Sequence, residues 1–147
     1  MDTNYSGVKV VTNCDLCNTP GGSLIWQDGF CRVVLVNDQD YPGFCRVILN
    51  QHVKEMTDLS REDRDRLMAV VFSVEKAVRD VMQPGKVNLA SLGNKTPHMH
   101  WHVIPRYTRD RTFPDAIWAS SKRETLSHQI DAATAARLKA EIQKTLG

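Results

Sequence analysis

Three histidines alternate with apolar residues in the segment His98-Met99-His100-Trp101-His102-Val103-Ile104. In an extended chain successive side chains point to opposite faces, so His98, His100 and His102 share one face. Neighbours on one face of a strand lie about 6.6 Å apart, because the rise is about 3.3 Å per residue. Three imidazoles can therefore line a single anion-sized site.

This row of histidines has three interpretations. In the first, a neutral imidazole attacks phosphorus while its neighbours bind the phosphate oxygens. In the second, the triad holds a catalytic zinc ion that keeps an open position for water. In the third, the histidines are only the polar face of a half-exposed strand. The chain has five histidines and no aspartate directly after the triad, which disfavours a two-metal hydrolase.

Cys14 and Cys17 form a Cys-x-x-Cys pair near the start of the chain. This spacing suits a tetrahedral metal ion, and a structural zinc needs two further ligands, for which His52 and His98 are the candidates. The alternative is a pair of reduced thiols near a turn. Cys31 and Cys45 fall in apolar runs, where we expect small core residues.

Short apolar runs predict the strands that position these residues. Asp28-Gly29 is a dipeptide typical of a tight hairpin between two of them. Pro97 and Pro105 bracket the histidine segment, where regular pairing is expected to end. The predicted strands span residues 23–28, 30–37, 44–49, 86–91 and 98–104.

A change to helical periodicity follows Ser60. Apolar residues repeat at three and four positions from Leu67 to Val81, with Ser60 as N-cap and Pro84-Gly85 as the end. A polar helix is expected from about Asp131 to Leu146. Strands grouped with helices on one side predict an α+β fold, with an antiparallel sheet of about five strands, one long helix and a C-terminal helix.

Composition suits one domain over residues 1–147. The chain is 41% hydrophobic and 24% charged with a formal net charge of +2, so it has no long-range field that favours a nucleic acid polymer or a membrane surface. The N-terminus lacks the pattern of a signal peptide, and eighteen consecutive apolar residues occur nowhere. We expect a cytoplasmic protein with reduced cysteines.

The histidine segment resembles the signature of the histidine-triad (HIT) superfamily, His-φ-His-φ-His-φ-φ with φ hydrophobic, and fits it at every position. The resemblance covers about residues 14–106 and leaves 107–147 as a C-terminal extension of the same domain. Other segments fall in the order usual for the family: Leu35-Val36-Asn37, Pro42-Gly43, Val47-Ile48-Leu49, His52, Asp58-Leu59 and the helix after Ser60.

The resemblance implies a two-step nucleotidyl transfer from a dinucleoside polyphosphate such as diadenosine tetraphosphate, or from a nucleoside phosphoramidate. His100 would be the nucleophile that forms a nucleotidyl-histidine, which water then hydrolyses. His102 would donate to the α-phosphate oxygens, and His98 completes the triad. Asn37 would hold the ribose hydroxyls and Asn88 would contact the phosphate.

The loop Gly93-Asn94-Lys95 occupies the place where relatives contact the leaving phosphate. Lys95 departs from the family's Ser or Thr, and it either meets a polyphosphate as a point charge or is a solvated loop residue. Asn37 is alternatively an ordinary turn former at a strand end.

The resemblance also implies a structural zinc on Cys14, Cys17, His52 and His98, as in several bacterial HIT proteins and galactose-1-phosphate uridylyltransferases. It implies a homodimer and no organic cofactor. Two other functions stay open: a zinc-dependent hydrolase with the triad as ligands, and a catalytically silent nucleotide- or zinc-binding module.

Overall fold

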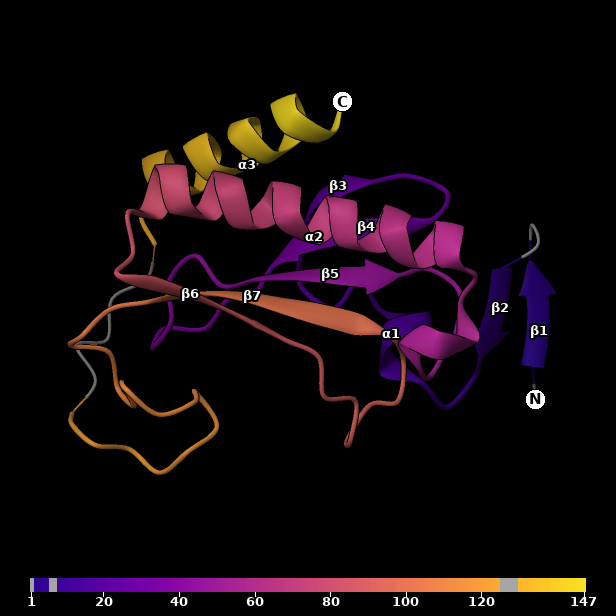
Figure 1. Cartoon of the computed structure of the whole chain (residues 1–147), viewed down its shortest axis with the longest axis horizontal. Coiled ribbons are helices and arrows are strands. Elements are labelled where there is room, and N and C mark those ends of the chain that lie inside the picture. The colour runs from indigo at the N-terminus through magenta and orange to yellow at the C-terminus, as the bar shows by residue number, and fades with distance from the viewer. Residues whose placement is uncertain (1, 6–7, 125–129) are drawn as a thin grey trace.

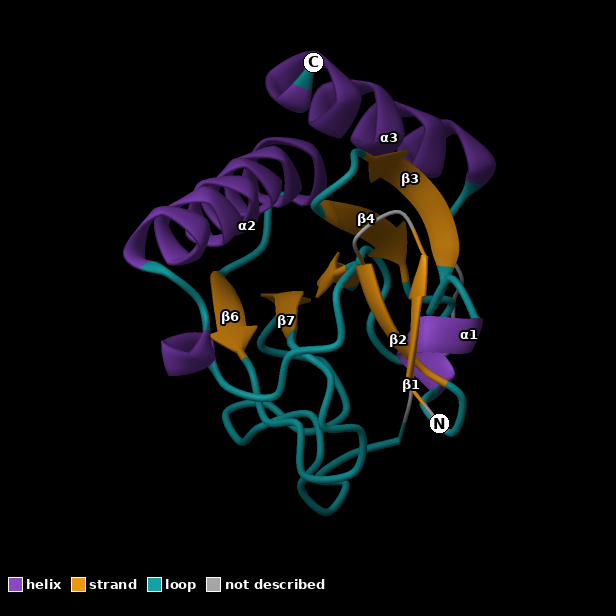
Figure 2. Cartoon of the chain, turned by 90° about the vertical axis from the view of Figure 1, so that its right-hand side faces the viewer, coloured by secondary structure: helices purple, strands orange, loops and turns teal. Residues whose placement is uncertain are grey.

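An antiparallel sheet of five strands forms the centre of the computed structural model, which describes residues 2–5, 8–124 and 130–147. Helices α2 (Arg61–Met82) and α3 (Ala132–Leu146) lie on one side of the sheet, as Figures 1 and 2 show. This arrangement confirms the predicted α+β fold. In spatial order the strands are β3 (Ser23–Gln27), β4 (Cys31–Leu35), β5 (Cys45–Leu49), β7 (His100–Arg106) and β6 (Lys86–Ala90).

The hairpin predicted at Asp28-Gly29 joins β3 to β4. The Asp28 carboxylate accepts hydrogen bonds from the backbone amides of Phe30 and Cys31 at 2.8 and 2.9 Å. An aspartate in this position satisfies the amides of the turn itself, so the two strands leave the turn already paired.

Helix α2 begins where the sequence predicts, because the Ser60 hydroxyl accepts from the amide of Asp63 at 3.1 Å. It ends at Gln83, which takes a left-handed conformation with φ of 50° just before Pro84. The apolar stripe of α2 is core within one chain. Its buried members are Leu67, Val70, Val71, Val74, Ala77 and Val78.

Helix α3 confirms the predicted C-terminal helix. Its N-cap Asp131 accepts from the Thr134 amide at 2.7 Å, and its buried residues Leu138 and Ile142 join the core against α2 and β3. Burial of an aliphatic side chain contributes about 1.5–3 kcal/mol, so these two residues attach the helix firmly.

Strand β7 is shifted from the prediction, since His98 precedes it and Pro105 lies inside it. Pairing with β5 ends at Val103, so Pro105 lies on a stretch that only β6 pairs, opposite Val87. A proline lacks the amide donor, and such an edge stretch tolerates it. The expectation that Pro105 ends the pairing is therefore wrong.

The N-terminal segment contains structure that the sequence patterns did not predict. Strands β1 (Asp2–Tyr5) and β2 (Val8–Val11) form a separate two-stranded sheet, followed by the short helix α1 (Asp15–Asn18). A 3-10 turn (Met56–Asp58) precedes α2. Among the described residues no helix has both the length and the apolar character that crossing a membrane requires.

A buried arginine holds the segment after β7. Arg106 is 2% exposed, and its guanidinium donates to both carboxylate oxygens of Asp110 at 2.7 and 3.0 Å. It also donates to the side chain of Asn88 and the carbonyl of Asp115, each at 2.7 Å. This network folds residues 107–124 back toward the open face of the sheet, away from α2 and α3 (Figure 1).

Asp110 is expected to make stability depend on pH in the acid range. Burial raises the pKa of its carboxyl, but hydrogen bonds from Arg106 and two backbone amides outweigh burial and hold the pKa below its usual value. A lowered folded-state pKa stabilises the fold above pH about 4, and this stabilisation is lost as the pH falls through the folded pKa. Asp110→Asn should therefore cost about 3 kcal/mol at pH 7, and this cost should shrink as the pH falls below about 4.

Urea denaturation of wild type and Asp110→Asn between pH 3 and 7 measures how the difference in their free energies of unfolding changes with pH. Asp65→Asn, at an exposed position of α2, is the matched control and should leave the pH profile unchanged. A constant difference between wild type and Asp110→Asn across this range would contradict the assignment.

Candidate active site

His100 is held in one orientation by the backbone just before its strand. Its Nδ1 lies 2.6 Å from the carbonyl oxygen of His98, so Nδ1–H donates there and Nε2 keeps its lone pair. The side chain is 8% exposed. Burial lowers the pKa of His100, the His98 carbonyl opposes this effect, and the charge of Arg46 adds to the lowering. The neutral imidazole is thus the favoured form, which is the form that can act as a nucleophile.

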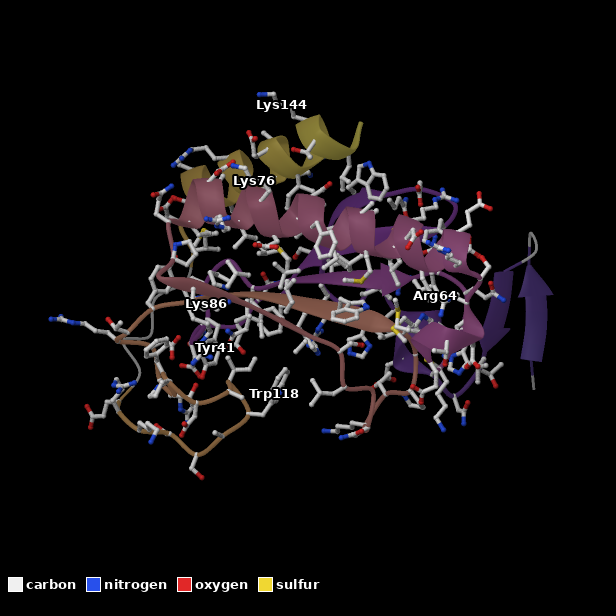
Figure 3. All side chains as sticks on the ribbon, in the orientation of Figure 1. Tyr41, Arg64, Lys76, Lys86, Trp118 and Lys144 are labelled. Atoms are coloured by element: carbon white, nitrogen blue, oxygen red, sulfur yellow. The ribbon has the colours of Figure 1, made fainter. Side chains whose placement is uncertain are left out.

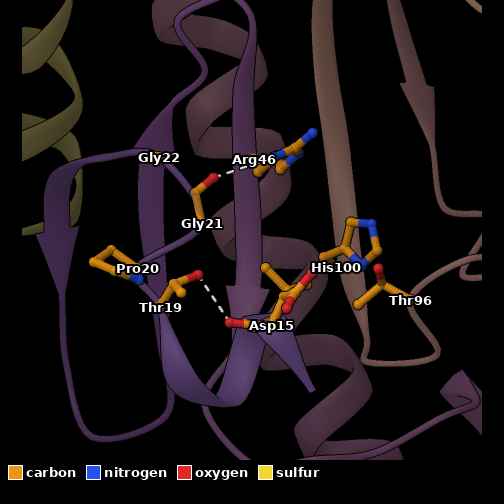
Figure 4. Close-up of a pocket in the computed structure, with 9 residues that line it drawn as sticks. Asp15, Thr19, Pro20, Gly21, Gly22, Arg46, Thr96 and His100 are labelled. Atoms are coloured by element: carbon orange, nitrogen blue, oxygen red, sulfur yellow. Dashed lines mark hydrogen bonds between the residues drawn. The ribbon is translucent and has the colours of Figure 1, made fainter. Parts of the chain in front are cut away.

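A cavity of about 420 Å³ opens beside this imidazole, and we call it the His100 cavity. Arg46 reaches it from β5, Gly21 and Gly22 from the loop before β3, and Thr96 from the loop before β7 (Figure 4). The complete lining is Asp15, Leu16, Thr19, Pro20, Gly21, Gly22, Arg46, Thr96 and His100.

His102 lies next along the same face of β7. Its ring meets those of His100 and Trp118 edge to face, with centroids 4.9 and 5.2 Å apart. Burial, followed by the charges of His100 and Arg46, lowers the pKa of His102 to about 3, so this imidazole is neutral at pH 7. Its Nδ1 is buried and has no hydrogen-bond partner among the described residues.

Trp118 extends from the C-terminal loop toward β7, as Figure 3 shows. It is 52% exposed and lines a second cavity of about 320 Å³ with Asn88, Ile104 and Ile117. The side-chain oxygen of Asn88 accepts from Arg106. An aromatic ring is therefore placed against His102 by the loop that follows β7.

The four residues proposed as metal ligands come together. The ligand atoms of Cys14, Cys17, His52 and His98 all lie within 4.8 Å of one another. The Nδ1 of His98 is 3.4 Å from each sulfur and 3.2 Å from Nδ1 of His52. Bond lengths of about 2.0–2.3 Å around a tetrahedral zinc put neighbouring ligand atoms about 3.3–3.8 Å apart, so this set can bind a metal ion.

The orientation of His98 supports the same conclusion. Its Nε2 is hydrogen-bonded to the carbonyl of Leu49, which directs Nδ1 toward the two cysteines. A second-shell bond of this kind fixes the tautomer and the ring of a metal-ligating histidine. The cysteines flank the start of α1, whereas His52 follows β5 and His98 precedes β7. A bound ion would thus join the N-terminal segment to the histidine strand.

Cys31 and Cys45 lie in the core, as predicted. Burial raises the pKa of both thiols to about 12. Neither thiol forms a thiolate near neutral pH, so both behave as small apolar residues.

The residues predicted to bind substrate are not all gathered around the triad. Asn37 is exposed and donates to the hydroxyl of Ser23 at 3.1 Å, outside both cavities. Asn94 and Lys95 are also exposed, whereas Gly93 lines a different cavity with Trp101 and His98. Within the described residues, the structure assembles the histidine triad and also assembles the Cys/His cluster. The loop Gly93-Asn94-Lys95 does not line the His100 cavity.

Sequence reasoning missed Arg46 and Thr96, which do line the His100 cavity. Arg46 had a usable signal, because it is a charged residue inside the apolar run Phe44–Leu49 and charged residues are rarely buried without a partner. Thr96 had none, since a threonine before a proline is ordinary in a loop.

The fold and the row of histidines define an α+β protein of the histidine-triad class. A family model described as the HIT domain matches residues 21–109, and the chain belongs to this family.

Two curated relatives match the chain at low identity. The chain is 26% identical over 115 residues to "Protein hit" of Bacillus subtilis, covering 72% of this chain and 79% of that protein. It is 28% identical over 85 residues to AP-4-A phosphorylase of Mycobacterium tuberculosis, covering 54% of this chain and 44% of that protein. The match thus spans less than half of the phosphorylase.

Solved structures share the fold. A histidine triad protein from Bradyrhizobium japonicum superposes with a TM-score of 0.71 at 24% identity, covering 87% of this chain and 92% of that chain. A Zn-bound histidine triad family protein from Mycobacterium smegmatis gives a TM-score of 0.63 at 20% identity, covering 90% and 94%.

Proposed function

We propose that this protein cleaves dinucleoside polyphosphates at the α-phosphate through a covalent nucleotide on His100. One observation carries the proposal: the His98 carbonyl occupies Nδ1 of His100, so the neutral ring keeps Nε2 for attack beside a cavity that contains Arg46. The name of the M. tuberculosis relative, AP-4-A phosphorylase, supports this substrate class over phosphoramidates.

The proposed reaction has two displacements at phosphorus. The lone pair of His100 Nε2 attacks the α-phosphorus, and the bond to the leaving phosphate breaks with its electron pair on the leaving oxygen. Water then attacks the same phosphorus and releases one proton to solvent. The P–N bond breaks with its electron pair returning to Nε2, so the nucleoside monophosphate leaves and His100 is neutral again. Dividing one displacement into two lowers each barrier.

Neighbouring residues are assigned supporting roles. His102 is the hydrogen-bond donor to the non-bridging α-phosphate oxygens, since its ring lies beside that of His100. Asn88 contacts the phosphate and Asn37 the ribose hydroxyls. The loop Gly93-Asn94-Lys95 contacts the leaving phosphate, although it does not line the His100 cavity.

Zinc is the metal that we propose for the Cys/His cluster, and the Zn-bound relative from M. smegmatis supports it. The ion would be a structural cross-link with four protein ligands, and no step of the reaction uses it. A catalytic zinc on the triad is less well supported, because His98 Nδ1 points toward Cys14 and Cys17 rather than toward His100.

We also propose that residues 1–147 form one domain, and that the protein is a cytoplasmic homodimer without an organic cofactor. Light scattering on a gel-filtration peak measures the mass, with about twice 16.6 kDa expected.

A substrate panel with intermediate trapping tests the function. Diadenosine tetraphosphate, diadenosine triphosphate and adenosine phosphoramidate are compared by kcat/KM, and the reaction is quenched in alkali, where a P–N bond survives. Mass spectrometry should find an adenylyl group on the peptide that contains His100. No turnover of any substrate and no adduct would indicate the silent binding module instead.

A further inference from the structure

Three arginines lie on the open face of the sheet, and Arg46 differs from the other two. Arg32 donates to the side chain of Asn50 and to backbone carbonyls, including that of Leu16 at 2.6 Å. Arg106 is fully occupied by the network described above. Arg46 makes one hydrogen bond within the described chain, from Nη1 to the carbonyl of Gly21 at 3.1 Å.

The rest of the Arg46 guanidinium is not used by the protein. Its Nε is buried and has no partner among the described residues, and no carboxylate there forms an ion pair with it. A buried N–H donor without an acceptor destabilises the fold, and a charged group does so more strongly. Nη2 also has no protein partner in the described part of the chain, so the guanidinium keeps donors for an acceptor in the cavity that Arg46 lines.

The register between β5 and β7 determines where the guanidinium of Arg46 lies. Arg46 of β5 pairs directly with His102 of β7, and both face the side of the sheet that carries His100. The guanidinium is 5.5 Å from the centroid of the Phe44 ring, which limits its freedom. Figure 4 shows Arg46 and His100 on neighbouring strands around one cavity.

The opposite wall of the cavity is the loop that contains Gly21. This residue has φ of +82°, and a Cβ there would lie 2.7 Å from Ile48 Cδ1, so the loop packs directly on the sheet. Asp15 also lines the cavity, but its side chain is exposed and its charge is screened by water. Arg46 is therefore the cation with buried, unused donors in this cavity.

We propose that Arg46 binds the phosphate chain beyond the α-phosphate that His100 attacks, so that the His100 cavity selects an anionic polyphosphate leaving group. The inference rests on the proposed function. A guanidinium binds phosphate oxygens through parallel N–H donors, and within the described residues only Nη1 of Arg46 is hydrogen-bonded to the protein. The cavity volume of about 420 Å³ lies within the range of small-molecule sites, about 300–1,000 Å³, so it holds more than the reacting phosphate.

A comparison of two leaving groups tests the proposal. Arg46→Gln is expected to lower kcat/KM for diadenosine tetraphosphate about tenfold to a hundredfold, the value of one or two charge-assisted hydrogen bonds. For adenosine phosphoramidate, whose leaving group is a neutral amine, the change should stay below about threefold. Arg46→Lys should recover part of the loss, and Arg61→Gln at the exposed start of α2 is the matched control for charge.

A binding measurement separates this proposal from the reaction. Inorganic tripolyphosphate is titrated into His100→Ala and into His100→Ala/Arg46→Gln by calorimetry, with a tenfold or greater loss of affinity expected in the second. If wild type cleaves neither nucleotide but this loss is seen, the proposed function fails and the anion subsite stands. The proposal is overturned if Arg46→Gln lowers kcat/KM equally for diadenosine tetraphosphate and adenosine phosphoramidate. It is also overturned if the affinity for tripolyphosphate does not change. A matching fall in melting temperature would also overturn it, because Arg46 would then act only by holding Gly21.

Discussion

Replacement of His100 by alanine is expected to reduce turnover of diadenosine tetraphosphate at least about a thousandfold, because removal of a nucleophile eliminates the covalent route. The hydrogen bonds that hold this part of β7 are made by its backbone, including the one from Ser91 to the His100 carbonyl at 2.7 Å. The variant should therefore fold, which circular dichroism can verify. Initial rates at saturating substrate measure the effect on kcat.

His102→Ala provides the contrast. It removes a stabilising donor but not the nucleophile, so a loss of about a hundredfold to a thousandfold and a still detectable adduct on His100 are expected. His100→Gly adds a rescue arm, since free imidazole can occupy the space of the missing ring and restore some turnover. Activity of His100→Ala near the wild-type rate would show that the covalent mechanism is wrong.

Removal of zinc is expected to lower the free energy of unfolding by about 4 kcal/mol or more, since a ligand present at a thousand times its Kd stabilises the native state by about that amount. The reason is topological as well as chemical. The cluster joins the start of α1 to residues beside β5 and β7, segments that are otherwise far apart in the chain. Thermal melts with and without a chelator measure the loss.

Metal analysis supplies the control for this prediction. Wild type should bind one zinc per chain, and Cys14→Ser should bind much less, because a structural site with three protein ligands has lower affinity. Cys31→Ala removes a thiol outside the cluster and should leave the zinc content unchanged. The metal-free protein should retain turnover in proportion to the fraction that is folded. A complete loss of turnover in fully folded, metal-free protein would favour a catalytic zinc instead.

The sequence predicted the elements that obey a strong local rule. Helix α2 follows a sustained apolar period and a Ser60 cap, and both are local properties. Spacing predicted the Cys-x-x-Cys pair, and the resemblance to the HIT superfamily supported His52 and His98 as its partners. The N-terminal hairpin was missed because its strands are four residues long, too short for alternation to be distinctive.

The features that could not be predicted depend on contacts between distant segments. The proximity of Arg46 to His102 follows from the register between β5 and β7, which a sequence pattern does not specify. The position of Trp118 against His102 follows from the path of the loop that Arg106 holds. Local patterns give the type of each element, whereas these placements come from tertiary hydrogen bonds.

The way in which the loop of residues 107–124 is attached affects how its sequence can change. Arg106 and Arg123 bind it through the carbonyls of Asp115 and Phe113, and Tyr41 donates to the carbonyl of Ile117. Every amino acid presents the same carbonyl, so side chains near the tip can diversify without loss of these attachments. Substitutions at residues 116–118 would therefore change what the loop presents to His102 and to the core beneath Ile117, while these three hydrogen bonds remain. Directed evolution for new nucleotide analogues should begin with a library at these three positions.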